Sequence, residues 1–139
     1  MYSACRLKKS RDFRRVFKFG KSTAGRYFVM YFFRKKSSDN HARLGVSVSR
    51  KIGNAVVRIR IRRLVKEALR DHMMALPMGL DIVVIARGPS AEIEFEVVKG
   101  SLLELLDKAL RMMKISLSTG VRVNGKQDKG TNMVSGRSG

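Results

Sequence analysis

The chain has 139 residues, 44% of them hydrophobic, a length that suits one domain built around a single core. Thirty Lys and Arg against eleven Asp and Glu give a formal net charge of +19, and a compact domain with that charge repels itself unless a polyanion neutralises it. We therefore predict a nucleic-acid partner. The apolar runs are too short to span a bilayer, and the single Cys5 excludes an internal disulfide and a cysteine-based zinc site, so we expect a soluble cytoplasmic protein.

The charge is distributed unevenly along the chain. Residues 1–21 and residues 50–70 each hold eight basic residues and one acidic residue, whereas residues 81–107 hold two basic and six acidic residues. This distribution predicts one basic face and one acidic face.

The first predicted element is a short amphipathic helix over residues 10–19. Phe13, Val16 and Phe17 have helical spacing, Ser10 is the expected N-cap, and Gly20 is expected to end the helix. Its Asp12 lies near the positive end of the helix dipole.

Two strands are predicted to follow this helix. The first covers residues 26–36, which are rich in aromatic and β-branched side chains. A turn at residues 37–41 leads to the second strand, over residues 42–50, in which Leu44, Val46 and Val48 alternate with small residues. The small side of this strand leaves room for the backbone of a ligand.

The segment "AVVRIRIRRLVKEALR", residues 55–70, fits two structures. As a strand it has one basic face, but the alternation breaks at Arg63 after seven residues, whereas a helix accounts for all sixteen. The helix forms an apolar face from Val57, Ile61, Leu64, Val65 and Ala68, and an opposite basic stripe from Arg58, Arg62, Lys66 and Arg70. We predict the helix, with Asn54 near its N-cap and Ile59 among the arginines rather than in the core. Because like charges at this spacing repel one another, the stripe favours a phosphate-bearing partner.

The last elements are a hydrophobic strand over residues 80–87 and a long amphipathic helix that starts between residues 91 and 96 and continues to Met113. We expect residues 1–116 to form the domain and residues 117–139, rich in Gly, Ser, Asn and Lys, to form a disordered basic tail.

The sequence contains no self-contained active site. Glu92, Glu94 and Glu96 are interpreted as acids at a helix start rather than metal ligands, and His41 and His72 have no spacing that presents two histidines to one metal. The aromatic residues leave two possibilities open, since they belong either to the core or to a surface where unstacked bases rest on rings.

The stretch "LGVSVSRKIGNAVVRIRIRRLVKEALR", residues 44–70, resembles the protein subunit of bacterial ribonuclease P, whose hallmark is a basic "RNR" helix. The resemblance extends to "LKKSRDFRRVFKFG" and "DIVVIAR", and so covers about residues 6–113. It implies an α+β (α/β) two-layer sandwich with three helices and a four-stranded mixed sheet, in the order α-β-β-β-α-β-α, with a left-handed crossover at the basic helix. We expect the additional strand to come from a split within residues 26–50.

The resemblance also implies a function. The protein binds a catalytic RNA and the single-stranded 5′ leader of precursor tRNA, and so assists the endonucleolytic maturation of the tRNA 5′ end. The catalytic centre and its Mg²⁺ belong to the RNA and substrate, so we expect no catalytic residue, no metal ligand, no small-molecule ligand and no membrane partner for this chain.

Two groups of residues carry these expectations. The RNA-binding residues implied by the resemblance and the basic stripe are Arg50, Lys51, Arg58, Arg60, Arg62, Arg63 and Lys66. The residues implied for the leader cleft are Phe13, Phe17, Tyr31, Val46, Ser47 and Ser49. Ile59 departs from the family pattern, which has asparagine in the middle of its "RNR". Two other interpretations are a small basic ribosomal protein and a protein-only metal nuclease.

Overall fold

The computed structural model describes residues 6–35 and 40–113. Within these two ranges, no helix is long and apolar enough to cross a membrane. The elements in chain order are α1 (Ser10–Phe19), β1 (Lys21–Ala24), β2 (Phe28–Arg34), β3 (Arg43–Ser47), α2 (Ala55–Met73), β4 (Leu80–Ala86), the short 3₁₀ helix η2 (Gly88–Glu92) and α3 (Phe95–Met112). Residues 37–39 of the turn predicted at residues 37–41, and the tail predicted at residues 117–139, lie outside the described residues.

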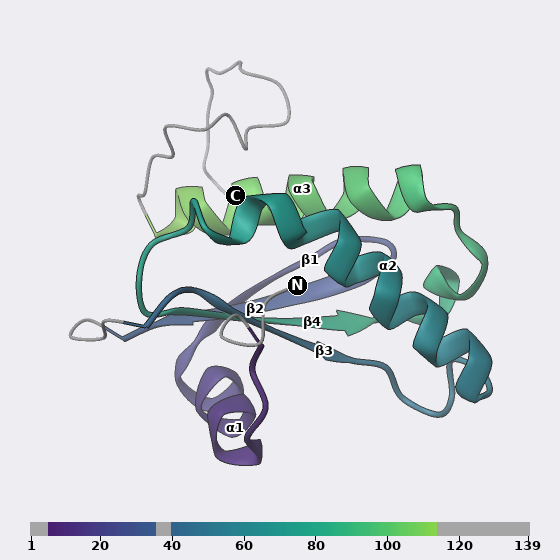
Figure 1. Ribbon diagram of the computed structural model, residues 1–139, viewed down its shortest axis with the longest axis horizontal. Helices are drawn as coiled ribbons and strands as arrows, with labels where there is room; N and C mark the ends of the chain where they lie inside the picture. Colours follow the sequence, from purple (N-terminus) through teal and green to yellow (C-terminus); the bar gives the residue numbers. More distant parts are fainter. Residues whose placement is uncertain (1–5, 36–39, 114–139) are drawn as a thin grey trace.

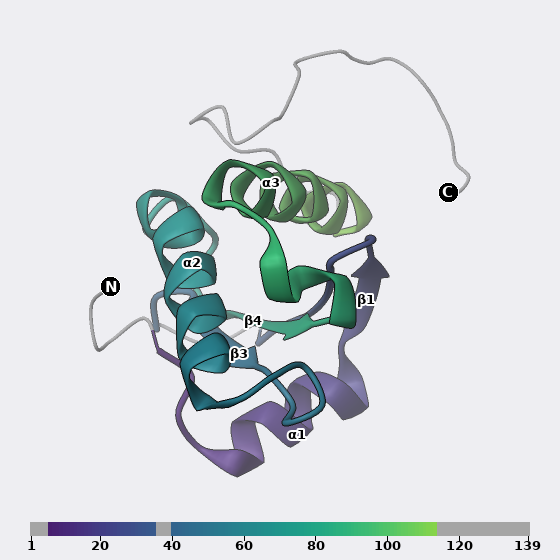
Figure 2. The same cartoon turned by 90° about the vertical axis from the view of Figure 1, so that its right-hand side faces the viewer.

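The four strands form one mixed sheet in the order β1-β2-β4-β3. β2 is antiparallel to both β1 and β4, whereas β3 is parallel to β4. The parallel pair is connected through α2. Figures 1 and 2 show α2 and α3 on one face of the sheet. If the sheet is viewed from that face with β3 and β4 pointing up, β4 lies to the left of β3. The crossover is therefore left-handed, as the resemblance implied.

The sheet and the layer of α2 and α3 form the predicted sandwich, and α1 crosses the opposite face of the sheet (Figure 2). Strand alternation sends Phe28, Met30 and Phe32 of β2 into the main core between the sheet and this helical layer. A small second cluster, with Leu7, Val16 and Val83 as its buried members, lies between α1 and the sheet. The main core therefore holds α2 and α3, and α1 depends on a much smaller apolar contact.

The predicted helices are confirmed, with one change at a helix start. α1 has the predicted range, but its N-cap residue is Lys9 and not Ser10, which lies inside the helix. Gly20 is the C-cap, as predicted. α2 is helical throughout residues 55–70, and the side chain of Asn54 caps it by accepting a hydrogen bond from the backbone N–H of Val57 at 3.0 Å.

The additional strand lies outside the range predicted for it. We expected it from a split within residues 26–50, but it is β1 (Lys21–Ala24), directly after α1. This strand has the sequence KSTA, is mostly exposed, and pairs only along one side with β2. A short polar edge strand buries no apolar row and so gives no hydrophobic period in the sequence.

Candidate nucleic-acid interface

The basic residues of α2 lie along its solvent side, because its apolar face is committed to the core. Ile61, Val65, Ala68 and Leu69 are buried in the main core. Ile59 is 46% exposed, which confirms its predicted place among the arginines. The predicted RNA-binding residues are exposed or half-buried, with Arg50 and Lys51 in the loop that precedes the helix: Arg50, Lys51, Arg58, Arg60, Arg62, Arg63 and Lys66.

Some of these cations already have partners within the protein. The guanidinium of Arg60 donates to the backbone carbonyls of Ile93 at 2.7 Å and Ala91 at 3.4 Å, and so connects α2 to the segment before α3. Arg70 of the predicted basic stripe pairs with Glu67 at 2.9 Å and lies 3.7 Å from Asp71. The stripe is therefore not uniformly available to a phosphate.

Arg58 and Lys66 have surroundings that favour an arriving anion. Among the described residues, Nε of Arg58 is a buried side-chain donor without a hydrogen-bond partner. Burial, followed by the charges of Arg6 and Arg62, lowers the pKa of Lys66 from its ordinary value. Arg6 belongs to the N-terminal segment that bridges to β3 at Leu44, so cations from two distant segments are close together. A bound phosphate would reduce this repulsion between cations.

The sheet face that α1 crosses carries rows of residues set by strand register. Tyr31, Val83 and Gly45 are neighbours in one row, and α1 lies over them. A Cβ on Gly45 would lie 2.6 Å from two ring atoms of Phe13, so this glycine makes room for the ring. Phe17 meets Tyr31 edge to face with ring centroids 5.0 Å apart and is 40% exposed.

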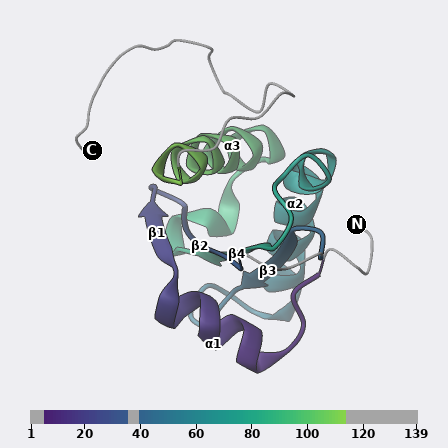
Figure 3. The ribbon, with the colours of Figure 1, turned by 90° about the vertical axis from the view of Figure 1, so that its left-hand side faces the viewer.

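The next row of the same face extends beyond α1, and we call it the open sheet row: Val29, Ile85 and Ser47. α1 crosses the strands near the start of β4, away from its arrowhead (Figure 1 and Figure 3). The burial of the β4 residues agrees, because Asp81 and Val83 are buried whereas Ile85 is half-buried. Half-buried apolar rows beside exposed rings are suited to contact with bases.

The predicted leader residues do not all share this face. Phe13, Phe17, Tyr31 and Ser47 lie on the α1 side of the sheet, and Ser49 follows β3 as an exposed residue. Val46 instead packs against the main core on the opposite face, since neighbouring residues of a strand point to opposite sides.

Sequence reasoning missed two residues of the open sheet row. Val29 and Ile85 both lie on the α1 side of the sheet and are half-buried. Alternation from Tyr31 would have placed Val29 on this face, because residues two positions apart point to the same side of a strand. Ile85 requires the register between β2 and β4, which the sequence does not contain.

The acidic residues within residues 81–107 lie mainly on η2 and α3, with Asp81 as the exception. Asp81 is buried beneath α1, whereas Asp107 is buried on α3 in the opposite layer. Glu96 lies in the first turn of α3, but Glu94 is its N-cap residue and Glu92 belongs to η2. In the two described ranges, no group of three or more His, Cys, Asp or Glu residues could hold a metal ion.

Comparisons with known proteins agree with this arrangement. The sequence model of the family described as "Ribonuclease P" matches residues 1–110. A curated relative named "Ribonuclease P protein component", from Bacillus cereus (strain Q1), is 45% identical over 104 residues, which cover 75% of this chain and 90% of the relative. The protein of the same name from Halalkalibacterium halodurans is 46% identical over 104 residues, covering 75% of this chain and 87% of the relative.

Solved structures give the same result for the fold. The RNase P protein of Staphylococcus aureus, 40% identical, matches with a TM-score of 0.67 over 80% of this chain and 96% of that chain. The RNase P protein of Thermotoga maritima, 38% identical, matches with a TM-score of 0.65 over 74% of this chain and 96% of that chain.

Proposed function

We infer that this chain, which belongs to the ribonuclease P protein family, is the protein subunit of a ribonucleoprotein that matures the 5′ end of precursor tRNA. The catalytic centre lies in the RNA subunit, and the protein assists by binding RNA. The observation that carries the residue-level proposal is that two surfaces of different chemistry lie on one small domain. One is the cationic side of α2, and the other is the sheet face with exposed rings beside α1.

The cationic side of α2 is proposed to bind the phosphates of the catalytic RNA. Arg62 and Arg63 present charge on the solvent side of the helix, and Arg58 adds a half-buried guanidinium. Guanidinium groups bind phosphate through paired hydrogen bonds, and each phosphate contact releases counterions from the RNA. RNA binding should therefore weaken steeply with salt.

The face beside α1 is proposed to bind the single-stranded leader. Phe17 and Tyr31 offer rings for base stacking, and the open sheet row offers an apolar floor with the small Ser47 at one end. Stacking tolerates any base, because every base has a π face. This surface suits a leader of variable sequence.

Mg²⁺ is proposed to be held by the RNA subunit and the substrate. The described residues offer no carboxylate cluster for it, so no step of this proposal passes through a metal ion held by the protein. The chain contributes positive charge, which lowers the repulsion between phosphates. The RNA should therefore require a lower metal concentration.

The experiment compares precursor and mature tRNA for affinity to the complex of this protein with a bacterial ribonuclease P RNA. We expect tighter binding of the precursor, and we expect Phe17→Ala to reduce that preference. Phe19→Ala is the matched control, because Phe19 is an exposed ring of α1 that packs beside Phe33, away from the open sheet row. Equal affinity for both tRNAs would contradict leader binding and would be the result expected of a ribosomal protein, an alternative that the comparisons do not support.

A further inference from the structure

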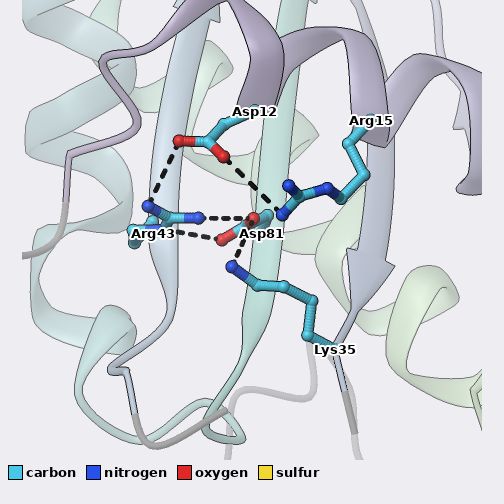
Figure 4. A network of polar contacts seen from close by, with 5 residues as sticks. All are labelled: Asp12, Arg15, Lys35, Arg43 and Asp81. Carbon is cyan, nitrogen blue, oxygen red and sulfur yellow. Dashed lines mark hydrogen bonds and ion pairs between the residues drawn. The ribbon is translucent and has the colours of Figure 1, made fainter. Parts of the chain in front are cut away.

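A group of charged side chains around two buried carboxylates joins the start of α1 to the sheet (Figure 4). Arg43 of β3 donates from Nε and Nη2 to the two carboxylate oxygens of Asp81 on β4, each at 2.9 Å. Its third nitrogen, Nη1, lies 3.5 Å from Asp12 in the first turn of α1. Lys35 lies 3.7 Å from Asp81, and Arg15 lies 3.7 Å from Asp12.

The carboxylates of this group are shielded from water. Asp12 is 6% exposed and Asp81 is 1% exposed. The hydrogen bonds to Asp81, with the charge of Asp12 adding to them, raise the pKa of Arg43, so its guanidinium stays charged. Burying paired charges gives little net stability, because desolvation offsets most of their attraction, but it fixes the geometry of the groups that pair.

The position of this group decides what its geometry controls. Asp12 and Phe13 are consecutive in α1, and their contacts on β3 are Arg43 and Gly45, two residues apart on one face of the strand. The first turn of α1 is therefore fixed to β3 at two neighbouring points. Ser47, the next residue on the same face of β3, belongs to the open sheet row.

The apolar contact beneath α1 is much smaller than the main core. Among the described residues, its buried members are Leu7, Val16 and Val83, and the aromatic residues around them are only partly buried. Apolar contacts are also non-directional, so the polar contact between Asp12 and Arg43 adds a directional restraint on the start of α1.

We propose that Arg43, acting through Asp12, is a positioning residue for the leader: it sets the separation between the rings of α1 and the open sheet row. This inference rests on the proposed function, and it adds residues that do not touch the leader. Loss of the bridge between Asp12 and Arg43 should leave the sheet intact, because the pair of Arg43 with Asp81 remains, and should let the first turn of α1 move.

The test is Asp12→Asn in the assembled holoenzyme. The amide keeps the size of the side chain and removes its charge, so Arg43 keeps its fork to Asp81. Asp107→Asn is the matched control, because Asp107 is also a buried carboxylate of a helix paired with an arginine, Arg111, but it lies on α3 across the sheet.

The readout is the affinity for precursor tRNA as a function of leader length, beside the affinity for mature tRNA and for the RNA subunit. Asp12→Asn should reduce the leader-dependent gain by about five-fold, the size of one ordinary polar contact, and should leave the other two affinities unchanged. Amide hydrogen exchange should become faster in α1 and stay unchanged in α2 and α3. Asp107→Asn should keep the full gain.

The outcomes separate the two proposals. A wild-type complex that binds precursor and mature tRNA equally overturns the proposed function, and this inference with it. A wild-type gain that Asp12→Asn retains in full overturns the positioning role alone, as does an equal loss for both tRNAs. If Asp12→Asn fails to fold, Arg43→Lys decides instead, because lysine keeps the charge but cannot bridge Asp12 and Asp81 at once. It should reduce the same gain, with unchanged amide exchange in β3 and β4 as the check that the sheet is intact.

Discussion

Replacing Gly45 by alanine puts a methyl carbon where the ring of Phe13 lies. That carbon would be 2.6 Å from Cε1 and Cζ of the ring and 3.3 Å from Cβ of Leu7. Carbon atoms in contact are normally about 3.5 to 4.0 Å apart, so the ring has to move by about 1 Å. Because Gly45 is buried within the sheet, the displacement falls on Phe13 and the start of α1. Overpacking of this kind costs about 1 to 3 kcal/mol of the free energy of unfolding.

Urea unfolding measures this loss, and two further variants show its cause. Gly100→Ala is the control, because Gly100 lies within α3 with no atom inside 4 Å of an added Cβ, and alanine there should stabilise the helix by about 0.5 to 1 kcal/mol. In a Phe13→Ala background, Gly45→Ala should cost almost nothing, since the clashing ring is gone. An equal cost of Gly45→Ala with and without the Phe13 ring would refute this reasoning.

Two further predictions concern α2. Ile59→Asn should change the free energy of unfolding by less than about 0.5 kcal/mol, because Ile59 is half exposed. It should also lower the Mg²⁺ concentration that the holoenzyme needs for half-maximal cleavage. The same Mg²⁺ dependence in both proteins would contradict this prediction. Arg60→Gln should cost about 0.5 to 1 kcal/mol of the free energy of unfolding, because its two carbonyl contacts are lost. Arg63→Gln should leave stability unchanged and reduce the salt dependence of RNA binding by about one phosphate contact. The reverse pattern in urea unfolding and salt titrations would exclude this assignment.

The elements that the sequence predicted are those with a long hydrophobic period. The apolar face of α2 repeats over sixteen residues, so the helical period is recognisable even though Ile59 and the arginines around it alternate like a strand. β1 has no such period, because it is a four-residue polar edge strand that is held by backbone pairing to β2. The position of β1 therefore depends on backbone hydrogen bonds to β2, which the pattern of side chains in the sequence does not reveal.

The candidate site shows a similar division. The faces of β3 follow from alternation, which places Val46 in the core with Leu44; the resemblance placed it in the leader cleft instead. Sequence reasoning interpreted Asp12 only as a favourable charge at a helix start, because its contact with Arg43 joins residues 31 positions apart. The two carbonyl contacts of Arg60 depend on the path of the chain before α3, and the family pattern identifies only a basic residue at that position.

Cleavage of a 5′-labelled precursor tRNA tests the central claim most directly. A bacterial ribonuclease P RNA is assayed at low Mg²⁺ with and without this protein, beside a reaction that contains the protein alone. We predict accurate cleavage at the mature 5′ end when the RNA and the protein are both present, with little cleavage by the RNA alone under these conditions and none by the protein alone. Cleavage by the protein alone, or no stimulation by protein that is bound to the RNA, would contradict the account.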